Sequence, residues 1–170
     1  MQIIEAIAAQ APQLAALRRD IHAHPELCYE ERRTADMVAE RLQAWGIPIH
    51  RGLGKTGVVG IVKGGDSPRA IGLRADMDAL PILELNRFGH CSVNKGVMHA
   101  CGHDGHTAML LGAAQALAER ERFSGTLNLI FQPAEEFGKR RSGATRMIED
   151  GLFEKYPCDA IFAMHNMPGH

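Results

Sequence analysis

Residues 98–106, with the sequence MHACGHDGH, constrain this chain more than any other stretch. They contain one cysteine, three histidines and one aspartate. Thiolate, imidazole and carboxylate groups are the ligands that divalent transition metals prefer in proteins. Only Gly102 separates Cys101 from His103, and a glycine lets the backbone bend so that both side chains face one point. The stretch therefore predicts a metal-binding site, and the alternative is a polar loop whose buried histidines are paired with backbone groups.

Composition limits what else the chain can be. Of its 170 residues, 45% are hydrophobic and 23% are charged, which is enough for one domain with a core. The formal net charge of −1 gives no indication of nucleic acid or an anionic membrane as a partner. The four cysteines lack CxxC spacing, which argues against a disulfide framework and a zinc ribbon. With no basic leader segment and no apolar run of membrane-spanning length, we expect a soluble, cytoplasmic protein.

Apolar spacing predicts two helices in the first part of the chain. Apolar residues recur every three or four positions over residues 3–22, as is typical of an amphipathic helix. Pro12 predicts either a kink in this helix or a start near Ala11. A second helix is predicted over residues 34–45, and Gly46 is expected to end it.

Short runs with β-type composition alternate with further helices. The runs lie at residues 47–50, 58–63, 70–74, 125–132 and 160–164. A helix is predicted to begin after Cys101, with Asp104 as its N-cap, and to end near Arg122, and another spans residues 143–149. This alternation of strands and helices predicts an α/β fold with layers.

Two aspartates follow the predicted strand at residues 70–74. The ends of strands are where α/β sheets place their sites, and Asp76 and Asp78 lie on one face if the strand continues. Two like charges on one face repel each other unless a cation lies near them. A metal site would satisfy both carboxylates, and the alternative is a turn in which each aspartate caps the strand.

Glu135 and Glu136 follow the apolar strand at residues 125–132. Adjacent glutamates are often a solvated pair, but two acids at the end of a buried strand suggest a cation. Consecutive strand positions point in opposite directions, so one carboxylate could bind a metal while the other reaches a water, as metal-assisted hydrolysis requires. His165 ends the next strand at the same edge of the sheet, and His106, in the first helical turn after the metal-binding stretch, is a supporting residue or a substrate contact.

Five segments, in this order, resemble the signature of the M20 metallopeptidase family. They are HAHPEL at 22–27, LRADMDALP at 73–81, MHACGHDGHTAMLLGAA at 98–114, FQPAEE at 131–136 and MHNMP at 164–168. They are most similar to the amidohydrolase branch, which includes hippurate hydrolases, N-acyl-amino-acid amidohydrolases and auxin-conjugate hydrolases. The resemblance implies a zinc-peptidase-like catalytic domain, in which helices flank a layered mixed sheet, and hydrolysis of the amide bond of N-acyl amino acids.

The resemblance also implies roles for individual residues. It implies a site for two divalent metal ions, and the donor types favour Zn, Mn, Ni or Co. It also implies that Glu135 is the general base that activates a water molecule. The metal ligands that it implies are Cys101, His103, Glu136 and His165. The supporting residues that it leaves are Asp76, Asp78 and His106.

In one respect the chain departs from the family. Members are generally more than twice as long, with an inserted lid or dimerisation domain and a later histidine ligand, which His170 is not expected to replace. We therefore expect residues 1–170 to be the N-terminal portion of an incomplete metal-dependent catalytic domain, with no second domain. The expected partners are a small N-acyl amino acid and either a second copy of the chain or a missing C-terminal half. The alternatives are a dipeptidase or carboxypeptidase of the same family, which Cys101 disfavours, and a non-catalytic metal-binding fragment.

Overall fold

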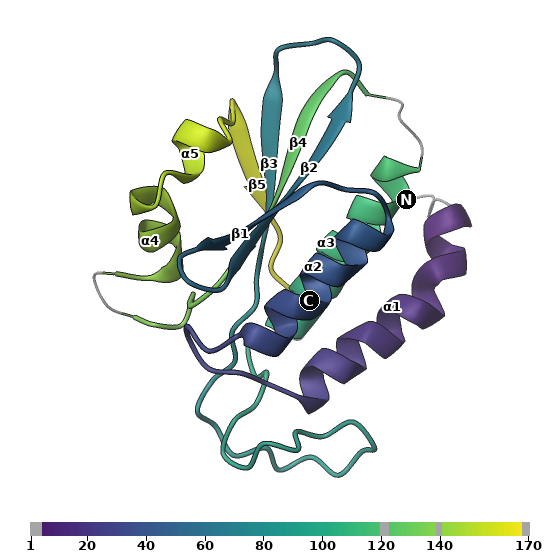
Figure 1. Ribbon diagram of the computed structural model, residues 1–170. Coiled ribbons are helices and arrows are strands. Elements are labelled where there is room, and N and C mark those ends of the chain that lie inside the picture. Colours follow the sequence, from purple (N-terminus) through teal and green to yellow (C-terminus); the bar gives the residue numbers. More distant parts are fainter. Residues whose placement is uncertain (1–4, 120–122, 139–140, 168–170) are drawn as a thin grey trace.

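A five-stranded sheet with helices on both faces forms the fold (Figure 1). The structure is a computed structural model that describes residues 5–119, 123–138 and 141–167. The helices are α1 (Glu5–Ala23), α2 (Arg32–Ala44), α3 (His103–Ala118), α4 (Gly143–Glu149) and α5 (Leu152–Lys155). The strands are β1 (Ile49–Leu53), β2 (Gly57–Gly64), β3 (Ala70–Asp76), β4 (Gly125–Gln132) and β5 (Ala160–Ala163). The predicted α/β fold with a layered mixed sheet is confirmed.

The strand order, β1-β2-β4-β3-β5, decides where the chain can build a site. β2 is antiparallel to β1 and β4, whereas β3 is parallel to both β4 and β5. The carboxyl ends of three neighbouring strands therefore meet at one edge of the sheet, where Asp76 pairs with Gln132. The acidic residues after β3 and β4, and His165 after β5, all leave the sheet at this edge.

Successive side chains of β2 and β4 pack on opposite faces of the sheet, as expected for extended strands. On the face covered by α2 and α3, the two strands contribute Val58, Val62, Leu127, Leu129 and Phe131 to the larger core. On the opposite face, Val59 and Ile130 pack against Met147 of α4 and Leu152 of α5. The helix α1 packs outside this core, against α3 (Figure 1).

The helix α1 runs through Pro12. It already includes Glu5, so the predicted alternative of a start near Ala11 is wrong. Pro12 lies on the exposed side of the helix, where the carbonyl group that loses its helical partner can bond to water. The expected start at residue 3 and the terminal His170 lie outside the described residues. None of the helices in the described part of the chain is both long enough and apolar enough to span a bilayer.

The start of α3 also differs from the prediction. Gly102, whose φ of 94° is left-handed, occupies the N-cap position, and no side chain caps the helix. Asp104 lies in the first turn instead, where its Oδ2 bonds at 2.9 Å to both Arg18 and His22 of α1. These side chains compete with the backbone for the carboxylate, and they fix α1 to the beginning of α3. The helix ends at Ala118, whereas the predicted end near residue 122 lies outside the described residues.

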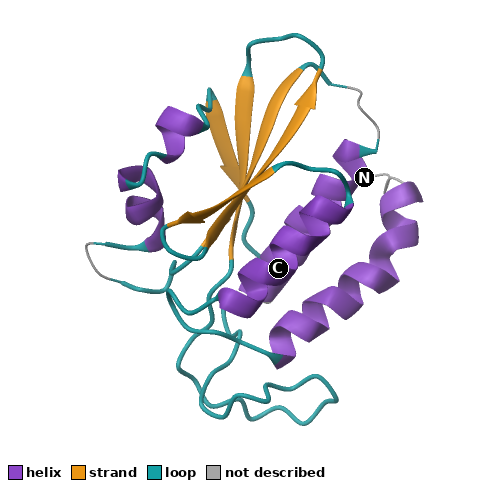
Figure 2. Cartoon of the chain, viewed as in Figure 1, coloured by secondary structure: helices purple, strands orange, loops and turns teal. Residues whose placement is uncertain are grey.

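A long ordered loop joins β3 to α3 (Figure 2). It closes on itself where Leu80 and Met98 exchange two backbone hydrogen bonds of 3.0 Å. The Glu84 carboxylate anchors the loop, because it accepts the backbone N–H of Ser92 at 2.6 Å and bonds to His22 Nε2 at 3.1 Å. Burial raises the pKa of Glu84, but the hydrogen bonds from Ser92, Asn86 and His22 outweigh burial and lower the pKa from 4.5 to about 2.

Replacing Leu129 by alanine tests the larger core. Leu129 is 0% exposed in the central strand β4, so Leu129→Ala should lower the free energy of unfolding by about 2–5 kcal/mol. Leu85, which is 83% exposed, provides the matched control, and Leu85→Ala should change the free energy by less than about 0.5 kcal/mol. Urea unfolding followed by circular dichroism measures both. Equal effects of the two substitutions would contradict the placement of the core.

The Glu84 anchor predicts a dependence of stability on pH. Because folding lowers the pKa of Glu84 from 4.5 to about 2, its charge stabilises the fold fully above pH 4.5, and this contribution disappears as the pH falls towards about 2. Glu84→Gln should therefore be less stable than the wild type at neutral pH, and the difference should shrink over that window. Urea unfolding of both proteins at several pH values measures it, and a difference independent of pH would refute the anchor.

Candidate metal centre

His103 lies at the centre of a set of potential metal ligands at the edge of the sheet. Among the described residues, three groups have ligand atoms within 4.8 Å of one another, and His103 belongs to all of them. The full set, hereafter the ligand cluster, is Asp76, Cys101, His103, His106, Glu135, Glu136 and His165. The cluster combines the start of α3 with residues at or after the ends of β3, β4 and β5. It contains every predicted ligand, base and supporting residue except Asp78, whose carbonyl oxygen lies 2.8 Å from His103 Nδ1.

The His103 ring is oriented by Asp78. Nδ1 lies 2.8 Å from the carbonyl oxygen of Asp78 and 3.3 Å from its Oδ1. Both oxygens accept a hydrogen bond, so the neutral ring carries its proton on Nδ1 and presents the lone pair of Nε2 to the cluster. Nε2 is buried and has no hydrogen-bond partner among the described residues. A polar atom in this state needs a partner, and a cation would supply one.

Three carboxylates face this unpaired nitrogen. The distances from His103 Nε2 are 3.7 Å to Asp76 Oδ2, 3.8 Å to Glu136 Oε1 and 3.9 Å to Glu135 Oε2. Burial lowers the pKa of His103, but its hydrogen bond to Asp78 and the charges of Asp76 and Asp78 outweigh burial and raise the pKa overall. The surroundings of the ring therefore favour positive charge.

Cys101 is affected by burial first and then by the same negative charge. Burial raises the pKa of its thiol to about 11, together with a hydrogen bond to Glu136 and the nearby carboxylates. Its Sγ lies 3.3 Å from His165 Nε2, and His165 donates Nδ1–H to the carbonyl oxygen of Asn166 at 2.8 Å. Like His103, His165 thus turns a lone pair towards the cluster. A bound divalent cation would reverse the charge balance and deprotonate the thiol, so the donor set fits a metal.

Asp78 positions the two glutamates through their backbone. Its Oδ1 accepts the N–H of Glu135 at 3.0 Å, and its Oδ2 accepts the N–H of Glu136 at 2.9 Å and the thiol of Cys28 at 3.2 Å. Burial raises the pKa of Asp78, but the hydrogen bonds from His103, Glu136, Cys28 and Glu135 outweigh it and lower the pKa. Asp78 is therefore a charged acceptor, not a cap of the strand that precedes it.

Glu135 and Glu136 do not lie on a strand. β4 ends at Gln132, and Ala134 has a left-handed φ of 48°, so the chain turns before it reaches the glutamates. The prediction that they point in opposite directions is wrong, since both carboxylates approach the same nitrogen of His103. They differ in exposure, because the Glu135 side chain is 41% exposed and that of Glu136 is 22% exposed. Glu135 is thus the one more accessible to water.

Asp76 is neutralised by the chain itself. Its Oδ2 lies 2.7 Å from Arg74 and its Oδ1 lies 2.6 Å from His106 Nδ1. The other ring nitrogen of His106 lies 2.6 Å from Asn166 Oδ1, so His106 connects Asp76 to the residue after His165. Arg74 and Asn166 were not predicted as site residues, although the segments LRADMDALP and MHNMP contain them. Their position inside these segments was the available signal.

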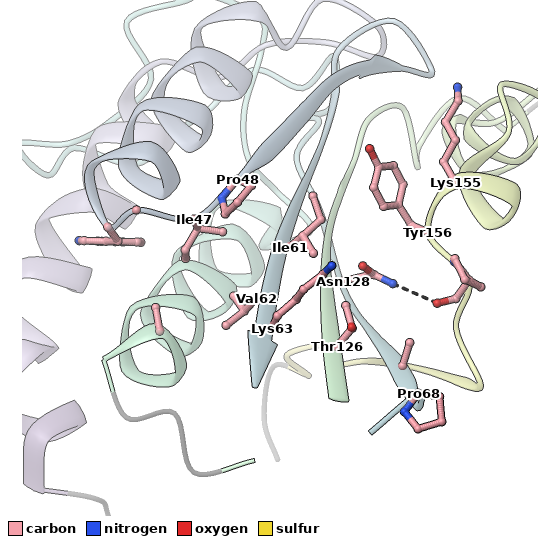
Figure 3. A pocket seen from close by; sticks show the side chains of 15 residues that line it. Ile47, Pro48, Ile61, Val62, Lys63, Pro68, Thr126, Asn128, Lys155 and Tyr156 are labelled. Atoms are coloured by element: carbon pink, nitrogen blue, oxygen red, sulfur yellow. Dashed lines mark hydrogen bonds between the residues drawn. The ribbon is translucent and has the colours of Figure 1, made fainter. Parts of the chain in front are cut away.

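Cavity size does not identify this site. A cavity of about 800 Å³ lies elsewhere, along β2 and β4, where Asn128 donates to the carbonyl oxygen of Pro157 at 3.1 Å (Figure 3). The described residues that line it include no histidine, cysteine or acidic residue. A smaller cavity of about 570 Å³ borders the ligand cluster at Cys101, with Asn166, Arg18 and Met109 also in its wall. This second cavity has room for part of a small molecule.

Residues 72–170 match the model of the peptidase family M20/M25/M40, and the chain belongs to this family. The chain is 50% identical over 168 residues to a hippurate hydrolase of Campylobacter jejuni, and the alignment covers 99% of this chain and 43% of that protein. It is also 48% identical over 151 residues to thermostable carboxypeptidase 2 of Saccharolobus solfataricus, and this alignment covers 88% of this chain and 38% of that protein.

The fold is similar to that of a solved member of the family. The crystal structure of the Bacillus subtilis YXEP protein, a dinuclear metal binding peptidase, matches with a TM-score of 0.88 and 41% identity. The match covers 95% of this chain and 45% of that protein. The chain thus spans less than half the length of each of these relatives.

Replacing Asp78 by asparagine tests the positioning of the ligand cluster. The substitution preserves size but removes the charge, and its amide group cannot accept both backbone N–H groups of Glu135 and Glu136. Metal affinity should fall about 10–100-fold, as for other residues that orient metal ligands. Titration with Co²⁺, followed by absorption, measures it. Asp20→Asn, at a half-exposed carboxylate of α1, is the control, and wild-type affinity in Asp78→Asn would contradict the role of Asp78.

Proposed function

We propose that this chain provides the metal centre of a hydrolase that cleaves the amide bond of N-acyl amino acids. The observation that carries the proposal is the buried Nε2 of His103, which has no hydrogen-bond partner among the described residues and faces the carboxylates of Glu135 and Glu136. The 50% identity to a hippurate hydrolase supports the substrate class, since hippurate is an N-acyl amino acid. We also propose that residues 1–170 form the N-terminal portion of a metal-dependent catalytic domain.

The centre would take two divalent cations. Sulfur, nitrogen and oxygen donors together suit Zn, Mn, Ni or Co better than Mg or Ca. The similarity to YXEP, a dinuclear metal binding peptidase, supports the number of ions. When bound, the ions would polarise the scissile carbonyl group and increase the acidity of water. The residues that would bind them are Cys101, His103, Glu136 and His165.

Glu135 acts as the general base. Its side chain is 41% exposed, and its Oε2 lies 3.9 Å from His103 Nε2, so it reaches both solvent and the ligand cluster. It takes a proton from the attacking water and passes that proton to the departing amine. Asp78 keeps the carboxylate in place through the backbone N–H of Glu135. The cavity of about 570 Å³ beside Cys101 accommodates one substituent of the substrate.

Carboxypeptidase activity is a second candidate, which the 48% identity to thermostable carboxypeptidase 2 favours. Both reactions break an amide bond to an amino acid with a free carboxylate, and they differ in the group that acylates its nitrogen. Comparing N-benzoylglycine and N-acetyl amino acids with unblocked peptides of similar size separates the two. Faster hydrolysis of the N-acyl amino acids supports the proposed function, and faster hydrolysis of peptides supports the second candidate.

The proposal predicts metal content and turnover together. Elemental analysis should find about two metal ions per chain, the number proposed for a two-metal hydrolase. Hydrolysis is assayed for the 170-residue chain and for a chimera in which it replaces the matching region of the Campylobacter jejuni hippurate hydrolase. A chimera that folds and binds metal but hydrolyses neither N-acyl amino acids nor peptides would refute the proposal.

The role of Glu135 is tested in the same chimera. Glu135→Gln should reduce kcat by about 10²–10⁴-fold, the usual contribution of a general base, and should leave the metal content unchanged. Glu149→Gln alters a glutamate that is 46% exposed in an ion pair with Arg141, and it serves as the matched control. Full turnover in Glu135→Gln would show that another group is the base.

A further inference from the structure

Glu31 is a fully buried carboxylate that the proposed mechanism does not use. It is 0% exposed and occupies the N-cap position of α2, where its side chain makes no capping bond. Its carboxylate accepts three hydrogen bonds instead. Oε1 accepts the N–H of Ala134 at 2.8 Å and the N–H of Tyr29 at 2.9 Å, and Oε2 accepts the hydroxyl of Thr56 at 2.5 Å.

The burial of this side chain is costly. Burial raises the pKa of Glu31, and the hydrogen bonds from Thr56 and from backbone N–H groups only partly offset that effect. A buried carboxylate of this kind is tolerated where its hydrogen bonds are complete. The three hydrogen bonds that the Glu31 carboxylate accepts therefore indicate which parts of the backbone it stabilises.

Both backbone groups that bond to Oε1 belong to residues with left-handed conformations. The φ values are 65° for Tyr29 and 48° for Ala134. This conformation is unfavourable for a residue with a Cβ atom, and it persists where surrounding interactions enforce it. One carboxylate oxygen thus stabilises two unfavourable turns, which lie more than a hundred residues apart in the sequence.

Ala134 directly precedes the two glutamates of the ligand cluster. The backbone N–H of Ala134 bonds to Glu31, whereas the N–H groups of Glu135 and Glu136 bond to Asp78. Three successive backbone groups are therefore bound by two buried carboxylates. A change of φ at Ala134 would rotate the backbone of the residues that follow it. Both glutamate side chains would then point away from His103.

We propose that Glu31 is a positioning residue of the metal centre, which fixes the left-handed turn at Ala134 and thereby directs Glu135 and Glu136 towards His103. Its effect on hydrolysis rests on the proposed function. Its effect on metal binding is measured without turnover. Loss of metal affinity on changing Glu31 would support the positioning role even if the chimera hydrolysed no N-acyl amino acid, so the two proposals can fail separately.

The test compares three variants of the 170-residue chain. Glu31→Met keeps an unbranched side chain without an acceptor, and it should weaken Co²⁺ binding about 10–100-fold and change the absorption spectrum of the bound ion. Glu31→Gln retains one oxygen for the two backbone N–H groups and should restore affinity to within about threefold. Thr56→Val removes only the bond to Oε2, so it is the matched control and should bind Co²⁺ like the wild type.

Urea unfolding of each variant separates positioning from stability. A folded Glu31→Met protein that binds Co²⁺ with wild-type affinity and spectrum would overturn the proposal, as would a Thr56→Val protein that loses as much affinity as Glu31→Met. If Glu31→Met does not fold, Glu31→Asp and Ala134→Gly are combined in a double-mutant cycle. Since both changes act on one turn, their effects on affinity should be non-additive, and additive effects would overturn the proposal.

Discussion

The hydrogen bonds around Asp78 are the interaction on which the rest of the site depends. Asp78 follows β3, and it bonds to the ring of His103 at the start of α3 and to the backbone of Glu135 and Glu136 after β4. It also accepts the thiol of Cys28, from the segment between α1 and α2. Four segments that are distant in the sequence therefore meet at one charged side chain. Its lowered pKa shows that these donors outweigh the cost of burial.

The sheet makes this convergence possible, because β3, β4 and β5 are parallel neighbours. Parallel strands end at the same edge, so residues that follow them need only a short turn to meet. The antiparallel pairing of β2 with β4 sends the β2 end in the opposite direction. β1 runs in the same direction as β4, but β2 and β4 separate it from β3. Both β1 and β2 contribute side chains to the cores and none to the ligand cluster.

The sequence predicted the strands that reach the site because their apolar runs are long and bounded by turn residues. It also predicted that Asp76, Asp78 and the adjacent glutamates follow strand ends. It could not predict that the glutamates share one direction, because that depends on the left-handed conformation of Ala134. Alanine has no preference for this conformation, and the carboxylate that enforces it belongs to a residue before α2.

The N-cap of α3 shows the same limit. Asp104 has the residue type and position of a cap, but Arg18 and His22 of α1 bind its carboxylate instead. The preference of aspartate for the N-cap position is outweighed by these two partners, which lie near Asp104 only because α1 packs against α3. Pro12 of α1 is the reverse case, where exposure to solvent allowed a helix to pass through a residue that usually interrupts one.

Charge explains why the chain can maintain so many buried acids at one edge. Arg74 forms an ion pair with Asp76, backbone N–H groups and Cys28 donate to Asp78, and Glu31 receives three donors. Beyond these pairings, Glu136 and Glu135 place two more carboxylates within 3.9 Å of His103 Nε2, which leaves an excess of negative charge at this edge. A divalent cation would relieve that excess, and it would bind the folded chain in preference to the unfolded one. Binding of the metal and stability of the sheet edge are therefore coupled, since the groups that would bind the ion come together only in the folded chain.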